Sequence, residues 1–266
     1  MRRPPCHGEV VIDLSALLAD LRAEGAELDA VVGDRPAADW STPTPAAGWT
    51  VAHQIAHLAW TDERALLAAT DPDAFAAELG RITDPTGFVD RGAAEGAALP
   101  PADLLRRWRT SRDRLAAALD SATGKLPWYG PPMSPASMAT ARIMETWAHA
   151  GDVADALGVV RVPTNRLRHV AHLGVRTRDF AYLVRGLPAP AEEFRIELSG
   201  PDGLWTWGPP EAAQQVRGPA LDFCRLVTQR VHRANTTLTA TGPDADTWLD
   251  IAQAFAGPPG AGRSEA

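Results

Sequence analysis

The stretch that decides the fold is METWAHAGDVADALG, from Met144 to Gly158. Its apolar spacing predicts a helix that ends at the glycine. Residues four apart on a helix differ by about 40° in direction and residues seven apart by about 20°, so Glu145, His149 and Asp152 share one face. Most neighbouring positions hold alanine or other apolar residues, which predicts that this face is buried. Burying an unpaired ionisable group costs several kcal/mol, so these three groups need partners.

The segment TVAHQIAHLAWTDERALLAAT, from Thr50 to Thr70, poses the same question on an earlier helix. Here His53 and His57 are four residues apart, and Trp60 continues their stripe. A stripe of aliphatic residues lies roughly opposite, so this helix is apolar on more than one side. The residues that could build a polar centre inside the helices are His53, His57, Glu145, His149 and Asp152.

Two interpretations fit this polar centre. Two imidazoles and one carboxylate, with a fourth position left to water, are a usual protein ligand set for a catalytic Zn²⁺ ion. Glu145 and His149 put two such ligands on one helix face, and a facing helix can supply the third, as in other helical bundles. The alternative is a set of core histidines that are hydrogen-bonded to buried acids. Because Glu-x-x-x-His also occurs as an ordinary exposed pair, the residues alone leave both interpretations open.

The order of the sequence patterns predicts an α+β protein with two domains. Helical patterns occur at about 13–34, 50–70, 71–82, 100–122, 138–158 and 163–187. FRIELSG, which begins at Phe194, alternates apolar and polar residues as a half-buried strand does, and LWTWG and TTLTATG predict further strands. Helices are predicted among them at 218–232 and 244–257. We therefore expect a helical domain at residues 1–190 and a small α+β domain at 191–266.

Composition narrows the class of protein. The chain has 266 residues, a net charge of −7 and 45% hydrophobic residues, which is ordinary for a globular protein and argues against nucleic acid as a partner. No run approaches the roughly 18 apolar residues that span a bilayer, so we expect no membrane association and no signal peptide. With only two cysteines, Cys6 and Cys224, we expect no disulfide framework and a cytoplasmic location. A homodimer is compatible with the sequence.

Two stretches give the sequence a family resemblance. GWTVAHQIAHLAWTDE and METWAHAGDVADALG, in this order and about ninety residues apart, resemble the mycothiol-dependent maleylpyruvate isomerase family. That family belongs to the DinB-like group of four-helix-bundle metalloproteins. The resemblance runs through most of the chain and is greatest to an actinobacterial branch labelled with a wyosine-base-formation domain. It implies a DinB-like four-helix bundle followed by a small sterol-carrier-like α+β domain.

The resemblance implies a divalent metal, Zn²⁺ by default, held by His57, Glu145 and His149, the positions that match the family's ligands. It also implies mycothiol as co-substrate, because a thiol bound to Zn²⁺ is deprotonated and the thiolate is the nucleophile. The predicted function is therefore a metal-dependent S-transferase or isomerase that acts on a small electrophilic metabolite.

The resemblance also suggests residues around the metal. We expect His53 to orient His57, to face the cofactor pocket together with Trp60, or simply to pack within the bundle. We expect Asp152 to accept a hydrogen bond from a ligand imidazole. The family's active site receives an arginine from the C-terminal domain. Arg230 is the first candidate for that catalytic role, and Arg176 is the second.

Two other functions remain open at this point. The metal could serve a thiol-independent cyclase, lyase or hydrolase of secondary metabolism by acting as a Lewis acid. Alternatively, the chain could be a non-catalytic, metal-stabilised module that binds an apolar ligand. The second alternative predicts a closed site with four protein ligands, in which His53 or Asp152 completes the shell.

Overall fold

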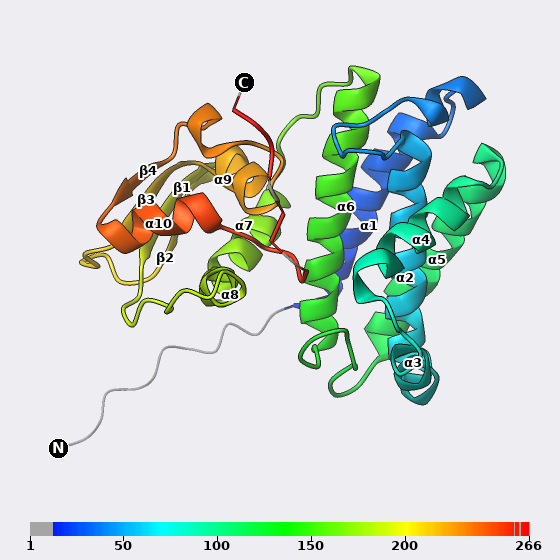
Figure 1. Cartoon of the computed structure of the whole chain (residues 1–266), viewed down its shortest axis with the longest axis horizontal. Coiled ribbons are helices and arrows are strands. Elements are labelled where there is room, and N and C mark those ends of the chain that lie inside the picture. Colours follow the sequence, from blue (N-terminus) through cyan, green and yellow to red (C-terminus); the bar gives the residue numbers. More distant parts are fainter. Residues whose placement is uncertain (1–12, 258, 261, 266) are drawn as a thin grey trace.

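The computed structural model describes residues 13–257, 259–260 and 262–265. A helical bundle and a smaller α+β unit lie side by side, and α6 (Pro135–Leu157) lies where they meet (Figure 1). This is the mixed α+β architecture that the sequence predicts. None of the described helices is long and apolar enough to cross a membrane. Cys224 is a free, buried thiol, and Cys6 lies outside the described residues.

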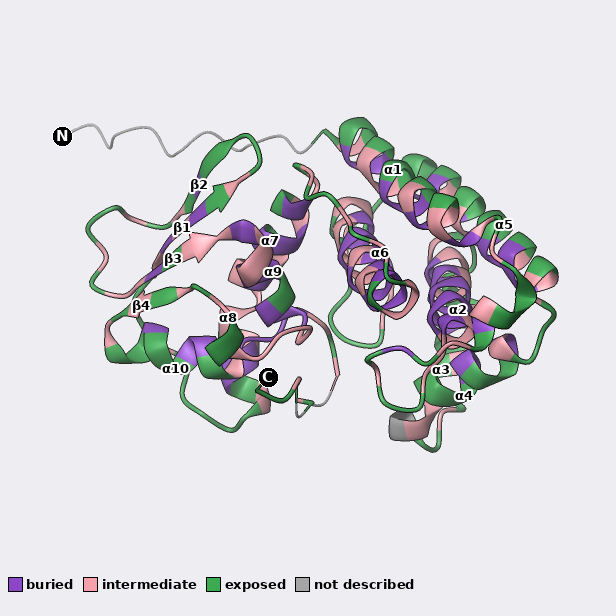
Figure 2. Ribbon diagram, turned by 90° about the horizontal axis from the view of Figure 1, so that it is seen from above, coloured by how far each residue is buried: buried purple, intermediate pink, exposed green. Residues whose placement is uncertain are grey.

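The bundle is formed by α1 (Leu14–Val32), α2 (Val51–Thr70), α5 (Pro101–Ser121) and α6. These helices pack against one another along their lengths, and their buried residues line the inner faces (Figure 2). One core cluster lies around Ile55, Leu104 and Trp108. A second includes Leu18, Leu115 and Met138. The opening stretch of sequence therefore lies on a helix that is covered on several sides, as its apolar neighbours predict.

Local sequence sets the ends of these helices. The Asp13 carboxylate accepts hydrogen bonds from the backbone N–H groups of Ser15 and Ala16, which caps α1. Ser134 caps α6 by accepting from the backbone N–H of Ser137. α6 ends at Gly158, which has a φ of 65°, a left-handed conformation that glycine adopts without a steric penalty.

Two additional helices, outside the four of the bundle, pack against α2. The first is α3 (Pro72–Leu79), where the sequence predicts a helix. The second, α4 (Pro85–Ala97), is not predicted, because its glycines weaken the helical pattern. One of these glycines, Gly92, allows α4 to pack closely on α2, because a Cβ added there would lie 2.7 Å from the indole of Trp60.

The C-terminal unit contains a four-stranded sheet within the described residues, in the order β2-β1-β3-β4. Its strands are β1 (Arg195–Gly200), β2 (Gly203–Trp207), β3 (Gln215–Pro219) and β4 (Thr239–Thr241). β1 pairs antiparallel with β2 and parallel with β3, and β3 pairs antiparallel with β4. The sequence prediction misses β3. It assigns part of that strand to a helix, which begins only after it as α9 (Ala220–Val227) and is followed later by α10 (Pro243–Ile251).

The predicted helix at 163–187 is two helices, α7 (Leu167–Arg176) and α8 (Arg178–Val184). Their buried residues Val170 and Tyr182 belong to the same apolar cluster as the sheet. The predicted domain boundary after residue 190 stays a prediction. From this packing, we propose an earlier boundary, in the connection at residues 158–166.

An ionic cluster fixes that connection against the bundle. The buried Glu24 carboxylate of α1 accepts from Arg161 Nη2 at 2.5 Å and from Arg166 Nε at 2.7 Å. Glu27, one turn later, accepts from Arg161 Nε at 3.0 Å. A carboxylate that is 1% exposed needs such charged partners, so the two arginines hold the connection at a defined place beside α1.

Candidate metal centre

The structure brings together three of the residues singled out by sequence: His57 of α2 with Glu145 and His149 of α6. His57 Nε2 lies 3.3 Å from Glu145 Oε2, and His149 Nε2 lies 3.2 Å from the same oxygen. Each residue offers one ligand atom, and these atoms all lie within 4.8 Å of one another. Among the described residues, no fourth His, Cys, Asp or Glu joins this group.

These spacings fit the donor set of a tetrahedral metal site. Protein nitrogen and oxygen ligands bind Zn²⁺ at about 2.0–2.2 Å, so two ligands at tetrahedral corners lie about 3.3–3.6 Å apart. The distances from Glu145 Oε2 to the two Nε2 atoms, 3.3 and 3.2 Å, lie close to that range. Three ligands from two facing helices leave one corner open, which is typical of a catalytic site and not of a closed structural one.

Burial and neighbouring groups shift the pKa values of His149 and Glu145. Burial, followed by the positive charge of His57, lowers the pKa of His149 to about 4. Burial acts to raise the pKa of Glu145, but the His149 and His57 imidazoles, when their Nε2 atoms are protonated toward it, hold that pKa well below its usual value. Near neutral pH the site therefore presents a neutral imidazole and an ionised carboxylate, the states in which these groups bind metals.

The indole of Trp49 covers one side of the cluster. Its ring centre lies 5.3 Å from that of His57 and 5.9 Å from that of His149, with the Trp49 and His149 rings nearly parallel at 20°. The Trp49 Nε1–H donates to Asp90 of α4 at 3.3 Å, which ties the ring to a second helix. The Glu145 side chain is 23% exposed to solvent. The cluster is therefore shielded by Trp49 but open at the carboxylate.

Asp152 lies on the same helix face but has a different partner from the one predicted. Its buried carboxylate accepts from Arg230 Nη2 at 3.1 Å and from Arg263 Nη2 at 2.6 Å. The partner of His149 Nδ1 is instead Gln54, whose Oε1 lies 2.5 Å away. The sequence analysis misses Gln54, although its place between two histidines on α2 is a signal for it.

Arg230 is the predicted arginine that the fold brings close to the cluster. It lies beyond the end of α9, next to Gln229, which has a φ of 58°, and not within a helix as predicted. Its charge contributes to the lowered pKa of His149, and its side chain contacts Asp152. It is held there through a further hydrogen bond from Nη1 to the carbonyl of Thr228 at 2.7 Å.

The remaining predicted site residues, His53, Trp60 and Arg176, make contacts away from the metal-ligand cluster. His53 Nδ1 accepts from the Thr50 backbone N–H at 3.3 Å, and the Thr50 side chain accepts from the His53 backbone N–H, which together form a capping box at the start of α2. Trp60 packs against Gly92 of α4. Arg176 is exposed at the last turn of α7. The roles predicted for these residues stay predictions, and the described contacts of His53 and Asp152 place them outside the three-residue cluster.

A second buried ionic pair lies next to the cluster along the bundle. Arg142, one turn before Glu145 on α6, donates from Nε to Asp62 Oδ1 at 2.9 Å, and both side chains are almost fully buried. Burial raises the pKa of Asp62, and the charge of Arg142 opposes that rise. The sequence analysis does not identify this pair, because their relation depends on how α2 and α6 face each other.

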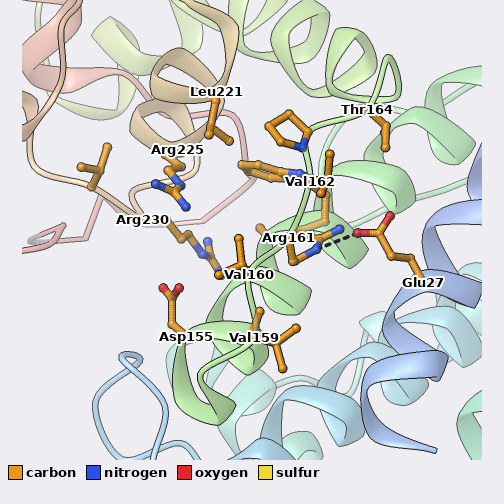
Figure 3. A pocket seen from close by; sticks show the side chains of 16 residues that line it. Glu27, Asp155, Val159, Val160, Arg161, Val162, Thr164, Leu221, Arg225 and Arg230 are labelled. Atoms are coloured by element: carbon orange, nitrogen blue, oxygen red, sulfur yellow. Dashed lines mark hydrogen bonds and ion pairs between the residues drawn. The ribbon is translucent and has the colours of Figure 1, made fainter. Parts of the chain in front are cut away.

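A cavity of about 290 Å³ lies between α6, the connection at 159–164 and the end of α9 (Figure 3). Arg225 and Arg230 extend toward it from the C-terminal unit, and Asp155 lies on the α6 side (Figure 3). Trp147 and Gly151 form part of its wall. Arg230 lines this cavity and also contacts Asp152 on another side of α6.

Fold and site together define a class: α+β proteins in which a helical bundle carries a His-Glu-His cluster with room for a divalent metal. Sequence comparison gives the family. The family profile described as mycothiol maleylpyruvate isomerase N-terminal domain matches residues 21–154, and one described as wyosine base formation matches residues 190–241. The chain therefore belongs to the mycothiol maleylpyruvate isomerase family, as the sequence motifs predict.

Relatives and solved structures agree with this placement. Uncharacterized proteins from two strains of Mycobacterium tuberculosis are each 58% identical over 255 residues, which is 94% of this chain and 99% of theirs. A crystal structure of the mycothiol-dependent maleylpyruvate isomerase aligns with a TM-score of 0.61 and 18% identity, covering 88% of this chain and 96% of that one. A histidine-to-alanine mutant of that isomerase aligns with a TM-score of 0.59 and 19% identity. These structures establish the common fold.

Proposed function

We propose that the protein is a metal-dependent enzyme that uses mycothiol to isomerise a small electrophilic metabolite or to form a thioether with it. The observation that carries this proposal is the convergence of His57, Glu145 and His149, whose ligand atoms lie within 4.8 Å of one another, in a chain of the mycothiol maleylpyruvate isomerase family. These three residues would hold the ion. When bound, a divalent ion such as Zn²⁺ supplies positive charge that favours the thiolate form of a thiol.

The residues around the cluster support thiol chemistry. Trp49 covers the imidazoles on one side and so limits the access of water from that side. The partly exposed carboxylate of Glu145 leaves an approach from another side. A nucleophile that is shielded from water reacts with a bound electrophile in preference to being lost to side reactions.

The charge of Arg230 supports a substrate class. This arginine acts on His149 and so lies near the cluster, and guanidinium groups bind carboxylates with two parallel hydrogen bonds. Asp152 has contacts from both Arg230 and Arg263, so its single charge does not neutralise both of them. We propose that the electrophile is a small organic acid whose carboxylate is oriented by Arg230. Arg176 has no such support from its exposed position.

Localisation and assembly stay predictions. A cytoplasmic protein is expected, and the possibility of a homodimer is open to direct measurement by sedimentation.

The proposal is tested by adding mycothiol to the Co²⁺-substituted protein and recording its absorption spectrum. We expect a near-ultraviolet band from thiolate-to-Co²⁺ charge transfer, and no such band with S-methylated mycothiol. The double variant Glu145→Ala/His149→Ala should lack the band, whereas Asp120→Asn, which removes an exposed carboxylate of α5, should retain it. A Co²⁺-loaded protein whose spectrum does not respond to mycothiol would contradict thiol use and leave a thiol-independent metalloenzyme.

A further inference from the structure

The hydrogen bonds around His149 continue away from the cluster and end at a backbone carbonyl. The carbonyl oxygen of Trp49 lies 2.9 Å from the Thr44 hydroxyl and 2.8 Å from the Thr44 backbone nitrogen. A carbonyl oxygen can only accept hydrogen bonds. The Thr44 hydroxyl must therefore donate its one proton to Trp49, which leaves its oxygen free only to accept.

This direction fixes the orientation of the next group, the Gln54 amide. Gln54 Nε2 lies 2.8 Å from the Thr44 hydroxyl oxygen and donates to it. The other end of the amide, Oε1, then faces His149 Nδ1 at 2.5 Å. An amide oxygen can only accept, so Nδ1 of His149 must carry the proton. Because Gln54 is fully buried, water does not offer it an alternative partner.

The proton on Nδ1 has a consequence for the other ring nitrogen. A neutral imidazole has one N–H, so Nε2 of His149 carries a lone pair. That lone pair faces Glu145 Oε2 at 3.2 Å. Two acceptors at this distance repel each other unless a cation lies near both of them. The chain of hydrogen bonds therefore prepares His149 as a metal ligand through Nε2.

The second histidine of the cluster lacks such a chain. His57 Nδ1 is buried and has no hydrogen-bond partner among the described residues. Its Nε2 also faces the Glu145 carboxylate, at 3.3 Å, which favours a proton on Nε2, and no described acceptor holds a proton on Nδ1 as Gln54 does for His149. The comparison shows that the fold holds one of the two histidines, His149, in the tautomer that frees Nε2, and that Gln54 is the residue through which it does so.

We propose that Gln54 is a positioning residue that holds His149 in the Nδ1–H tautomer and directs its Nε2 to a divalent metal, with Thr44 setting the orientation of the Gln54 amide. The inference rests on the metal site of the proposed function. Metal-bound histidines commonly donate their outer N–H to an acceptor, and loss of that acceptor lowers metal affinity about 10–100-fold. We expect a loss of this size in Gln54→Leu, which removes the acceptor.

Two further variants separate positioning from packing. Gln54→Glu keeps an oxygen acceptor for His149 Nδ1, so its Zn²⁺ affinity should stay within a few-fold of wild type. Thr44→Val keeps the shape of the side chain but removes the hydroxyl that orients the amide, so its affinity should fall between those of Gln54→Leu and wild type. Competition against a chromophoric chelator measures the affinity, and thermal unfolding of the metal-free variants verifies that each is folded.

The direct test is the tautomer of His149 in the metal-free wild-type protein, read from the ¹⁵N chemical shifts of its ring. We expect Nδ1 protonated and Nε2 unprotonated, and a mixture of tautomers in Gln54→Leu or, if that variant does not fold, in Thr44→Val. An Nε2–H tautomer in wild type, or unchanged Zn²⁺ affinity in folded Gln54→Leu, would overturn the proposal. The wild-type tautomer measurement needs neither metal nor mycothiol, so its failure is distinct from failure of the proposed function.

Discussion

The interior of the helical bundle and the interior of the C-terminal unit are built from different groups. Between α2 and α6 the bundle buries Asp62, Arg142 and His149, and α6 also buries Asp152 against arginines of the C-terminal part. In the C-terminal unit beyond residue 166, the buried polar side chains among the described residues are the uncharged Thr228 and Gln253, within an otherwise apolar core. Burying charge costs free energy unless each charge is paired. The contrast is what the binding site proposed for the bundle would produce, whereas the C-terminal interior is an apolar packed core.

The largest change in stability is expected from breaking the buried pair of the bundle. Arg142→Leu leaves the Asp62 carboxyl buried without its partner, which should lower the free energy of unfolding by about 3–5 kcal/mol. Urea denaturation measures this loss. The double variant Asp62→Leu/Arg142→Leu should recover most of it, because no unpaired charge remains. A double variant as unstable as the single one would mean that packing, not charge, decides this position.

A substitution in the apolar core of the C-terminal unit should lower the free energy of unfolding without changing the affinity for the metal. Leu198 of β1 is fully buried in the apolar cluster, so Leu198→Ala should lower the free energy of unfolding by about 2–5 kcal/mol. Zn²⁺ affinity of the folded variant should be unchanged. An affinity that falls with the stability would show that the two interiors are coupled and not independent.

The pH dependence of stability should come from the bundle. His149 has a lowered pKa of about 4 in the folded chain, while an unfolded histidine has a pKa near 6.5. Between these values the unfolded chain binds a proton that the folded chain does not. The metal-free protein should therefore lose stability as pH falls from about 6.5 to about 4, by up to about 1.4 kcal/mol per pH unit for this proton.

Glu145 acts in the same direction at lower pH, since its lowered pKa is also a source of stability that protonation removes. Urea denaturation at a series of pH values measures the combined slope. His149→Gln should flatten the slope between about 6.5 and about 4. An equal slope in that variant would assign the pH dependence to other groups.

The smallest effect is expected where the two regions meet. Arg263 and Arg230 both contact the Asp152 carboxylate, so Arg263→Ala leaves one guanidinium in place. We expect a loss of less than about 1 kcal/mol in the free energy of unfolding, as for other partly exposed ion pairs. A loss above about 2 kcal/mol would show that Arg263 is part of the bundle core.

The sequence predicts most helices of the bundle and the members of its polar cluster. Helix spacing limits the polar centre to five candidates, because residues three, four and seven apart share one face and charged groups on an apolar helix stand out. The resemblance to the isomerase family then selects His57, Glu145 and His149 among them. The partners of these groups could not be identified in the same way. Gln54 and the Asp62–Arg142 pair depend on how α2 faces α6, and a pattern within one helix does not contain that information.

Secondary structure was harder to predict where local preferences and packing disagree. The glycines of α4 weaken its helical pattern, yet Gly92 is what the close contact with Trp60 requires. β3 is short and contains Gly218 and Pro219, both unfavourable in strands, but it lies between β1 and β4 and takes its structure from them. Thr177 separates α7 from α8, and buried residues of both helices belong to the apolar cluster of the C-terminal unit.

The most direct test of the metal site is the metal content of the purified protein after exposure to Zn²⁺ and removal of free ions, determined by mass spectrometry. We predict about one divalent ion per wild-type chain, and only background metal in Glu145→Ala/His149→Ala, which should remain folded by circular dichroism. Asp120→Asn is the matched control and should bind as wild type does. Full occupancy in the double variant, or a wild-type chain that binds no ion, would contradict the account.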